Sequence, residues 1–335
     1  MSITSPTAPL TGSSTTRPAT APVVATALPA LFADQIRSRL GAVARVIDIL
    51  AGEALPAELP GPVVALVSPW SLRDSHATAV LAAVEQAGWV HFLSTGVDGF
   101  PLERLAGRTV TCGRGTNSAA IAELTVGLLL AAEKRIPDIW EAETNEPFLA
   151  EPLGTLAGRT IGLIGFGSIG QELALRLDGF GTRLLAVRRS GRPAELPTVT
   201  VVPTLPDLLG QTDHLIVAAP LTPLTDRLLN DEAFAVTKPG VHLVNVARGR
   251  IVDTGALVRA LAAGIVTRAS LDVTDPEPLP ADHPLRRDHR VRILPHLSWS
   301  APGGPDRGID LFVSNLRRWQ AGQPLDGLVD VDAGY

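Results

Sequence analysis

The stretch from Gly158 to Gly191 constrains the fold more than any other part of this chain. An apolar run of strand type at 160–164 leads directly into Gly165-Phe166-Gly167-Ser168-Ile169-Gly170, and helical spacing follows at 171–177. A second strand is predicted at 183–187, which completes a βαβ unit. Because parallel strands need a crossover between them, this stretch predicts a parallel sheet.

The three glycines have the spacing of a dinucleotide-binding turn. Gly165 is predicted to make the tight turn, Gly167 to let the backbone approach a pyrophosphate, and Gly170 to let the helix pack close to the strand. The helix N-terminus then faces the phosphates. A GxGxxG sequence also occurs as a merely tight structural turn, but the strand before it and the helix after it favour a dinucleotide site at 165–170.

The end of the second strand predicts which dinucleotide binds. A carboxylate about 20 residues after the glycines accepts hydrogen bonds from the adenosine ribose of NAD, whereas arginine accommodates the 2′-phosphate of NADP. Here the strand ends in Val187-Arg188-Arg189-Ser190. Two guanidiniums and a hydroxyl suit a phosphate dianion, so these residues predict a preference for NADP(H), with NAD(H) left open as a second coenzyme. The alternative is that the arginines form only a solvated turn.

The composition excludes several classes of partner. A net charge of −5 over 335 residues offers no broad basic field for nucleic acid or an anionic membrane. No apolar run reaches the length of about 18 residues that predicts a membrane-spanning helix. Cys112 is the one cysteine, which excludes an internal disulfide and a multi-cysteine metal site, and no metal is expected. Within the apolar run at 109–112, it is expected to be a buried small hydrophobe rather than a nucleophile.

The first 29 residues are rich in Ala, Thr, Ser and Pro, and they lack the charged-then-apolar order of a secretory signal. Residues 1–29 are expected to form a disordered leader, because they bury too little apolar surface to offset their ordering entropy. The protein is accordingly expected in the cytoplasm.

Helical and strand patterns alternate along the rest of the chain. Strands are predicted at 45–49, 63–67, 90–93, 109–112, 199–202, 214–218, 242–245 and 268–271, with a last one that ends at 293–294. Helices are predicted at 32–40, 77–87, 117–135, 205–209, 255–263 and 304–319. This alternation is typical of α/β folds with parallel sheets.

Three loops in the second half place ionisable groups just past predicted strand ends. Arg248 lies in one of them, Asp272 and Glu277 in a proline-stiffened acidic loop, and His296 in the third. Each alone is ambiguous, since an arginine or an acidic loop is usually solvated and a lone histidine is usually a satisfied polar residue. Together they bring a cation, a carboxylate and an imidazole to the carboxyl edge of one sheet, beside the nucleotide turn.

With these residues in place, the chain resembles the D-isomer-specific 2-hydroxyacid dehydrogenases, the group of glyoxylate/hydroxypyruvate reductases, D-lactate and phosphoglycerate dehydrogenases. The resemblance runs from about residue 30 to residue 335. It rests on TGVD at 95–98, LAGRTIGLIGFGSIG at 156–170, AAPLTPLT at 218–225, LVNVARGRIVD at 243–253, SLDVTDPEPLP at 270–280 and ILPHLSWS at 293–300. So many ordered blocks are specific for the family, but they say much less about the substrate.

The resemblance implies three catalytic residues. Arg248 is expected to grip the carboxylate and carbonyl oxygen of a 2-oxo acid, helped by backbone N–H groups at Thr95 and Gly96. His296 is expected to protonate the carbonyl oxygen while the nicotinamide delivers hydride, and to act as the base in reverse. Glu277 is expected to hydrogen-bond His296 and to fix its orientation.

The resemblance also implies further contacts to the cofactor and substrate. Asp272 matches the position that holds the nicotinamide carboxamide, and Pro220, Thr222 and the backbone near Ala247 are expected to line the cofactor. Trp299 stands where relatives usually carry a small residue, close after the histidine. Its indole is expected either to line the substrate pocket or to belong to the core.

Two departures from the family pattern concern the coenzyme: Arg188 stands where NAD-dependent relatives carry Asp, and Ser168 stands where many carry Arg. The expected architecture is two doubly wound, Rossmann-like α/β domains. Residues 117–303 form the dinucleotide-binding domain, inserted into a flavodoxin-like substrate domain built from 30–116 and 304–335. The nearly apolar helix at 117–135 must be buried, in the core or against a second subunit, and like the family it suggests a homodimer.

The predicted function is NADPH-dependent reduction of a small 2-oxo acid, such as glyoxylate, hydroxypyruvate or an arylpyruvate, to the D-2-hydroxy acid. Two alternatives stay open. One is oxidation of an unusual donor such as phosphite, and the other is a non-catalytic nucleotide-sensing corepressor. The combination of Arg248, Glu277 and His296 argues against the corepressor.

Overall fold

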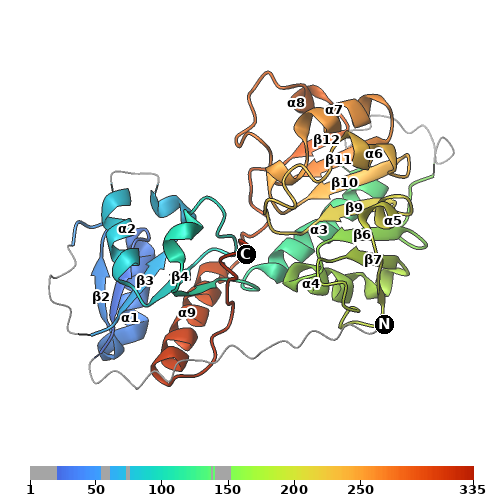
Figure 1. Cartoon of the computed structure of the whole chain (residues 1–335). Coiled ribbons are helices and arrows are strands. Elements are labelled where there is room, and N and C mark those ends of the chain that lie inside the picture. Colours follow the sequence, from blue (N-terminus) through green and yellow to red (C-terminus); the bar gives the residue numbers. More distant parts are fainter. Residues whose placement is uncertain (1–20, 54–60, 73–75, 137–138, 140–151) are drawn as a thin grey trace, which may run out of the picture.

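The computed structural model describes residues 21–53, 61–72, 76–136, 139 and 152–335. Within them the chain forms two bodies, each built around its own parallel β-sheet and joined side by side (Figure 1). The two doubly wound α/β sheets predicted from the sequence are confirmed. The exact division at 116/117 and 303/304 stays a prediction.

The first body has a five-stranded sheet in the order β2-β1-β3-β4-β5, and every neighbouring pair is parallel. Its strands are β1 (Val23–Thr26), β2 (Arg45–Asp48), β3 (Val63–Val67), β4 (Trp89–Phe92) and β5 (Thr109–Cys112). Helices α1 (Ala30–Leu40) and α2 (Ala77–Gln86) belong to the same stretch of chain.

Strand β1 corrects the predicted leader at 1–29. All four of its residues are buried, and they pair with β2 on one side and β3 on the other. A short Val-Val-Ala-Thr run is a suitable core strand once two neighbours cover its edges, although its surrounding composition gives no sign of this. Residues 1–20 lie outside the described residues.

The chain returns to the first body through helix α9 (Gly304–Gln320). Its buried residues Ile309 and Phe312 join a core cluster with Trp89 of β4, and the rings of Trp89 and Phe312 stack with centroids 5.5 Å apart. Beyond α9, Leu328 forms an antiparallel bridge to Thr111 of β5. The segment near the C-terminus is therefore tied to the first sheet.

The second body has a seven-stranded parallel sheet in the order β12-β11-β10-β9-β6-β7-β8. Its strands are β6 (Thr160–Ile164), β7 (Arg183–Val187), β8 (Val199–Val201), β9 (His214–Val217), β10 (Val241–Asn245), β11 (Val266–Leu271) and β12 (Val291–Ile293). The chain order reverses at β6, which lies between β7 and β9. Ligands of doubly wound folds bind at such a reversal, outside the carboxyl ends of the strands.

The helices of the second body are α3 (Ser118–Glu133), α4 (Ser168–Leu177), α5 (Leu205–Leu209), α6 (Asp231–Ala235), α7 (Thr254–Ala262) and α8 (Pro284–Arg287). Helix α3 packs against α4, and its residues Ile121, Ala122 and Leu129 join a core cluster that includes buried residues of β6, β7, β9 and β10. The short helices α6 and α8 lie outside the predicted helices. Among the described residues, no helix has the length and apolar character needed to cross a membrane.

Cys112 lies at the end of β5 and is 1% exposed. Burial raises the pKa of its thiol, so the thiol stays protonated at neutral pH. The prediction of a buried, unreactive cysteine agrees with this placement.

Candidate active site

The candidate site lies where adjacent strands of the second sheet end. Loops carrying the predicted residues leave β12, β11, β10, β9, β6 and β7, which are consecutive in the sheet. The residues that follow these strands are, in that order, His296, Asp272 with Glu277, Ala247 with Arg248, Pro220 with Thr222, Gly165–Gly170, and Arg188–Ser190. Since all the strands are parallel, these loops share one edge of the sheet.

The glycine turn has the backbone that its sequence predicted. Gly165 has φ +92°, and a Cβ on it would lie 2.9 Å from the carbonyl oxygen of Ala218. A Cβ on Gly170 would lie 2.8 Å from the ring of Phe166. A Cβ on Gly167, in contrast, would meet no atom within 4 Å. Gly165 and Gly170 are therefore required for packing, whereas Gly167 leaves space in front of the N-terminus of α4, as a bound pyrophosphate needs.

The arginines after β7 already have partners within this chain. The guanidinium of Arg188 donates from Nη1 to both carboxylate oxygens of Glu195, at 3.0 and 3.1 Å. The guanidinium of Arg189 lies 4.8 Å from the centre of the Tyr335 ring, which belongs to the first body. Ser190 is exposed, and its hydroxyl accepts a long hydrogen bond from the backbone N–H of Arg192 at 3.4 Å.

Arg248 reaches from the loop after β10 to the loop after β4. Its Nε donates to the two carboxylate oxygens of Asp98 at 3.0 and 2.8 Å, and its Nη1 donates to the carbonyl of Ala247 at 2.7 Å. Its Nη2 lies so close to Gly96 that a Cβ there would be 1.8 Å away. The guanidinium thus lies against the Thr95-Gly96 loop, as the carboxylate-binding hypothesis requires. The hydroxyl of Thr95 itself donates to the carbonyl of Gly113 at 3.1 Å.

The acidic loop and the histidine loop meet at one hydrogen bond. Nδ1 of His296 lies 2.7 Å from Oε1 of Glu277, and their side chains are 26% and 44% exposed. His296 has φ +55°, a left-handed conformation that is uncommon outside glycine. Its backbone N–H donates to the carbonyl of Asp272 at 3.0 Å, which ties the turn to the end of β11.

Asp272 supports the histidine loop. Its buried carboxylate accepts hydrogen bonds from the backbone N–H of Leu297 at 2.9 Å and of Ser298 at 3.1 Å. The indole N–H of Trp299 donates to the carbonyl of His296 at 2.8 Å, and Trp299 is 38% exposed. This exposure does not fit the core alternative for Trp299 and favours a place at the surface of the site.

The remaining predicted cofactor residues lie in the loops after β9 and β10. The backbone N–H of Thr222 donates to the hydroxyl of Thr225 at 2.8 Å, and that hydroxyl donates to the carbonyl of Pro220 at 2.7 Å. Ala247 donates its N–H to the side-chain oxygen of Asn245 at 3.1 Å. Both loops are thus held by hydrogen bonds of their own at the carboxyl edge of the sheet.

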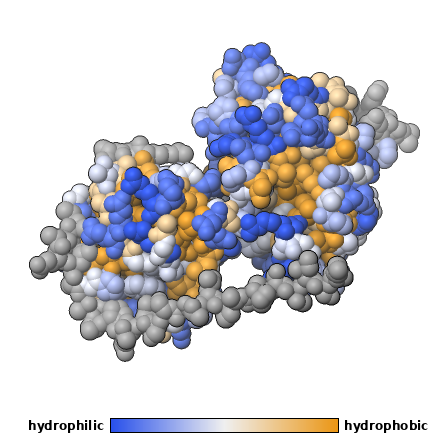
Figure 2. All heavy atoms as spheres, viewed as in Figure 1, coloured by the Kyte–Doolittle hydropathy of each residue, from blue (hydrophilic) through white to orange (hydrophobic). Residues whose placement is uncertain are grey.

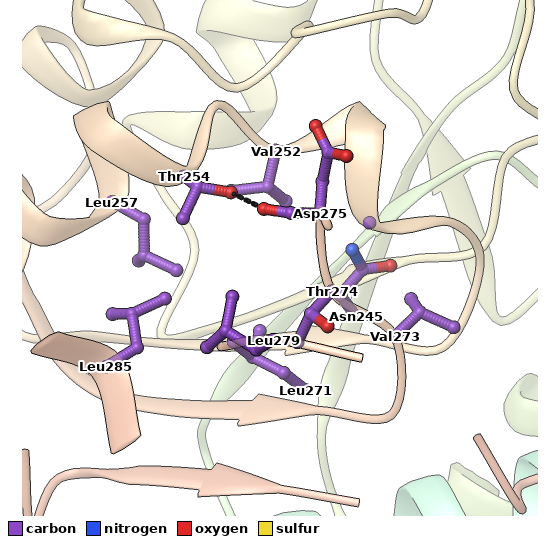
Figure 3. A pocket seen from close by; sticks show the side chains of 11 residues that line it. Asn245, Val252, Thr254, Leu257, Leu271, Val273, Thr274, Asp275, Leu279 and Leu285 are labelled. Atoms are coloured by element: carbon purple, nitrogen blue, oxygen red, sulfur yellow. Dashed lines mark hydrogen bonds between the residues drawn. The ribbon is translucent and has the colours of Figure 1, made fainter. Parts of the chain in front are cut away.

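A small apolar pocket lies between the loop that carries Arg248 and the acidic loop (Figure 3). Leu257, Leu271, Leu279 and Leu285 converge on it, and the hydroxyl of Thr254 donates to the carbonyl of Asp275 at 2.9 Å. Gly249 packs so closely beside it that a Cβ would lie 2.0 Å from the carbonyl oxygen of Thr274. These contacts fix the Arg248 loop against the acidic loop that carries Glu277.

The sequence analysis does not predict two side chains of this site, Asp98 and Glu195. Asp98 belongs to the TGVD block but had no role assigned, and its pairing with Arg248 spans 150 residues. Glu195 lies in a Pro-containing loop whose composition is that of any solvated turn. Neither partner is apparent without the fold, because only the sheet topology brings the loops together.

This fold and site define a dinucleotide-dependent oxidoreductase: the open turn at Gly167 fits a nicotinamide dinucleotide, and a cation, a carboxylate and an imidazole lie at the same sheet edge. The family model described as "D-isomer specific 2-hydroxyacid dehydrogenase, NAD binding domain" matches residues 126–298. The chain belongs to the D-isomer-specific 2-hydroxyacid dehydrogenase family and is an enzyme with a nicotinamide cofactor.

Relatives and solved structures agree with this assignment. The glyoxylate reductase of Thermofilum pendens is 34% identical over 274 residues, 77% of this chain and 79% of its own. The glyoxylate reductase/hydroxypyruvate reductase of Homo sapiens is 35% identical over 242 residues, 70% of this chain and 74% of its own. A D-isomer-specific 2-hydroxyacid dehydrogenase of Xanthobacter autotrophicus, solved in complex with NADPH and MES, is 28% identical, with a TM-score of 0.80 over 94% of this chain and 99% of that one.

Proposed function

We propose that the protein reduces a small 2-oxo acid, of the glyoxylate, hydroxypyruvate or arylpyruvate type, to the D-2-hydroxy acid, with NADPH as the preferred coenzyme. The observation that carries the proposal is the 2.7 Å contact between His296 and Glu277, whose loops follow β12 and β11, the two strands next in the sheet to the one that leads into Arg248. Relatives named as glyoxylate and hydroxypyruvate reductases support the substrate class.

Each residue of the candidate site has its own role in the proposed reaction. A bound dihydronicotinamide supplies the hydride that adds to C2 of the oxo acid. Arg248 holds the substrate carboxylate against the Thr95-Gly96 loop, with its guanidinium fixed by Asp98. Because Nδ1 of His296 is engaged by Glu277, the other ring nitrogen, Nε2, is the one that gives a proton to the carbonyl oxygen. The carbonyl carbon thus gains the hydride and its oxygen gains the proton.

The coenzyme preference rests on the residues after β7. Arg188, Arg189 and Ser190 follow the strand that lies beside the glycine turn, at the position where NAD-binding folds carry an acid. Two guanidiniums at this place suit the 2′-phosphate of NADP. The NADPH complex of the Xanthobacter autotrophicus relative supports the same preference.

The chain is also proposed to form a homodimer through α3. This helix buries Ile121, Ala122 and Leu129 in the core, while Leu124 lies outside that core cluster and is partly exposed. Figure 2 shows apolar side chains gathered on the surface of the second body. A partly exposed apolar helix face is typical of a subunit interface, and light scattering after size-exclusion chromatography measures the oligomeric state directly.

The test is coenzyme oxidation against a panel of 2-oxo acids, with NADPH and with NADH. We expect turnover with at least one oxo acid and a higher kcat/KM with NADPH. His296→Ala is expected to lower kcat by about a hundredfold or more, the usual contribution of a positioned general acid. Wild-type turnover in that variant would remove His296 from the mechanism, and equal use of both coenzymes would refute the NADPH preference.

A further inference from the structure

The coenzyme pocket contains a negative charge of its own. Glu195 follows Arg188 by seven residues, and its two carboxylate oxygens accept from one nitrogen, Nη1, at 3.0 and 3.1 Å. The Arg188 side chain is 19% exposed and the Glu195 side chain 53%. The Arg188 guanidinium, which is expected to meet a 2′-phosphate, is thus already paired with the carboxylate of the more exposed Glu195.

The position of Glu195 is fixed by its neighbours. Ala194 and Leu196, on either side of it, pack against the core cluster beneath β6 and β7. The side chain of Gln171, in the first half of α4, is a further, minor cause that lowers the pKa of the Glu195 carboxyl. Glu195 therefore lies near both the end of β7 and the helix whose N-terminus is expected to face the pyrophosphate.

Glu195 is ionised at neutral pH. Its own backbone N–H, followed by the Arg188 guanidinium, holds the pKa of this carboxyl below its usual range. A phosphate dianion that approaches Arg188 must displace this carboxylate or remain close to it. Either event weakens phosphate binding, because two anions then share one cation. A ribose that carries only a 2′-hydroxyl leaves the pair intact.

We propose that Glu195 is a specificity-determining residue of the coenzyme site: its carboxylate competes with the 2′-phosphate for Arg188 and so limits the discrimination between NADP and NAD. This inference rests on the proposed function, since it takes Arg188 as the residue that meets the 2′-phosphate. The inference gives a role to Glu195, whose charge is opposite to that of the arginines proposed to bind the phosphate. On this reading, a site with two arginines remains accessible to NAD(H).

The test uses two fragments that differ only in the phosphate, 2′,5′-ADP and 5′-AMP, titrated calorimetrically into the full chain at low ionic strength. Glu195→Gln is expected to bind 2′,5′-ADP roughly two- to fivefold more tightly, the range that an exposed ion pair supports. Affinity for 5′-AMP should stay unchanged. The ratio of kcat/KM for NADPH over NADH should rise by the same factor.

Two further variants isolate the effect. Glu85→Gln is the matched control, because Glu85 is also 53% exposed and also pairs with an arginine, Arg104, but in the first body. It should change neither affinity. In the Arg188→Ala background, Glu195→Gln should no longer raise the affinity for 2′,5′-ADP, since the cation for which the two anions compete is gone.

The outcomes separate this inference from the proposed function. Unchanged or weaker binding of 2′,5′-ADP by Glu195→Gln overturns the inference, and weaker binding shows instead that Glu195 positions Arg188 for the phosphate. If the wild type binds the two fragments equally but Glu195→Gln prefers 2′,5′-ADP, the NADPH preference fails while the inference stands. If the wild type prefers 2′,5′-ADP and the variant does not differ from it, the preference stands and the inference fails.

Discussion

At the scale of single residues, Asp98 and Arg248 form the contact that most directly links the two bodies at the candidate site. Their side chains are 29% and 32% exposed, and the carboxylate accepts twice from Nε of Arg248. This leaves Nη2 directed toward Gly96. Asp98 is thus a positioning residue, because it turns the guanidinium toward the place where a substrate carboxylate is proposed to bind.

Asp98→Asn is predicted to raise KM for the 2-oxo acid about tenfold, since hydrogen bonds to a charged group typically contribute about 1.5 kcal/mol or more. The KM for the coenzyme should not change. Asp226→Asn is the matched control, because Asp226 is 31% exposed and pairs with Nε and Nη2 of Arg250. Steady-state kinetics check this, and an unchanged KM for the oxo acid in Asp98→Asn would show that Arg248 is oriented without it.

At the scale of elements, the β6–α4 turn contains one glycine that packing requires, Gly165, and one that faces open space, Gly167. Gly165→Ala is predicted to lower the melting temperature, because φ +92° costs an alanine about 1–2 kcal/mol and its Cβ would meet the backbone of Ala218 and Ala219. Gly167→Ala should leave the melting temperature unchanged, since its Cβ enters open space. It should weaken dinucleotide binding by about fivefold to a hundredfold, the usual range for an overpacked contact.

Thermal unfolding without coenzyme and calorimetric titration with NADP⁺ measure the two effects separately. If Gly167→Ala bound NADP⁺ as tightly as the wild type does, the pyrophosphate would have to lie elsewhere. If Gly165→Ala were as stable as the wild type, the turn would tolerate a conformation other than the one observed.

Strand β4 carries a histidine that has to remain neutral in the folded protein. His91 is fully buried, its Nδ1 lies 2.7 Å from the hydroxyl of Thr111, and burial lowers its pKa to about 3. Because the folded-state pKa is lower than the unfolded one, this group's contribution to stability is complete above pH 6.5 and is lost as the pH falls toward 3.

Lowering the pH from 7.5 to 5.5 is therefore predicted to reduce the free energy of unfolding by about 1.4 kcal/mol through His91 alone. His91→Asn keeps a polar atom near Thr111 but has no group that titrates in this range. The loss of unfolding free energy between pH 7.5 and 5.5 should therefore be smaller by about 1.4 kcal/mol in this variant than in the wild type. Urea unfolding followed by tryptophan fluorescence measures it, helped by Trp89, whose ring centre lies 6.0 Å from that of His91. Parallel pH dependences for the two proteins would contradict the prediction.

The elements that the sequence predicted are those with strong local patterns. The βαβ unit at 158–191 and the long helices α3 and α9 each carry their own periodicity, so their positions follow from the residues alone. Strand β1 was missed because four apolar residues in an Ala/Thr/Pro-rich segment become a strand only between two neighbours. The ion pairs of Arg248 and Arg188 could not be predicted, because Asp98 and Glu195 are fixed by loop geometry that has no sequence period.

At the scale of the whole molecule, the two bodies are joined by crossings of the chain and by a few side-chain contacts. The segments that connect them lie side by side, since Nε of Arg307 on α9 donates to the carbonyl of Thr116 at 2.8 Å. The hydroxyl of Ser118 donates to that of Ser168 at 2.9 Å, next to the glycine turn. The arrangement places the end of the described chain between the bodies (Figure 1).

Tyr335 belongs to that end and links the first body to the loop after β7. Its neighbours Val329 and Val331 pack on the core of the first sheet, whereas its ring faces the guanidinium of Arg189 at 4.8 Å. A cation–π contact at an exposed site is worth about 0.5–1 kcal/mol, which makes this a weak, reversible link between the bodies.

Tyr335→Ala is accordingly predicted to speed amide hydrogen exchange in the loop 188–192 by roughly two- to fivefold, because the loop loses a contact of about 0.5–1 kcal/mol. Tyr335→Phe is the control, since it keeps the aromatic face that attracts Arg189 and removes only the hydroxyl. Exchange followed by mass spectrometry locates the effect. Equal exchange in the wild type and Tyr335→Ala, or the same acceleration in Tyr335→Phe, would mean that the ring does not restrain the coenzyme loop, and that the two bodies are held together at Arg248 and the chain crossings instead.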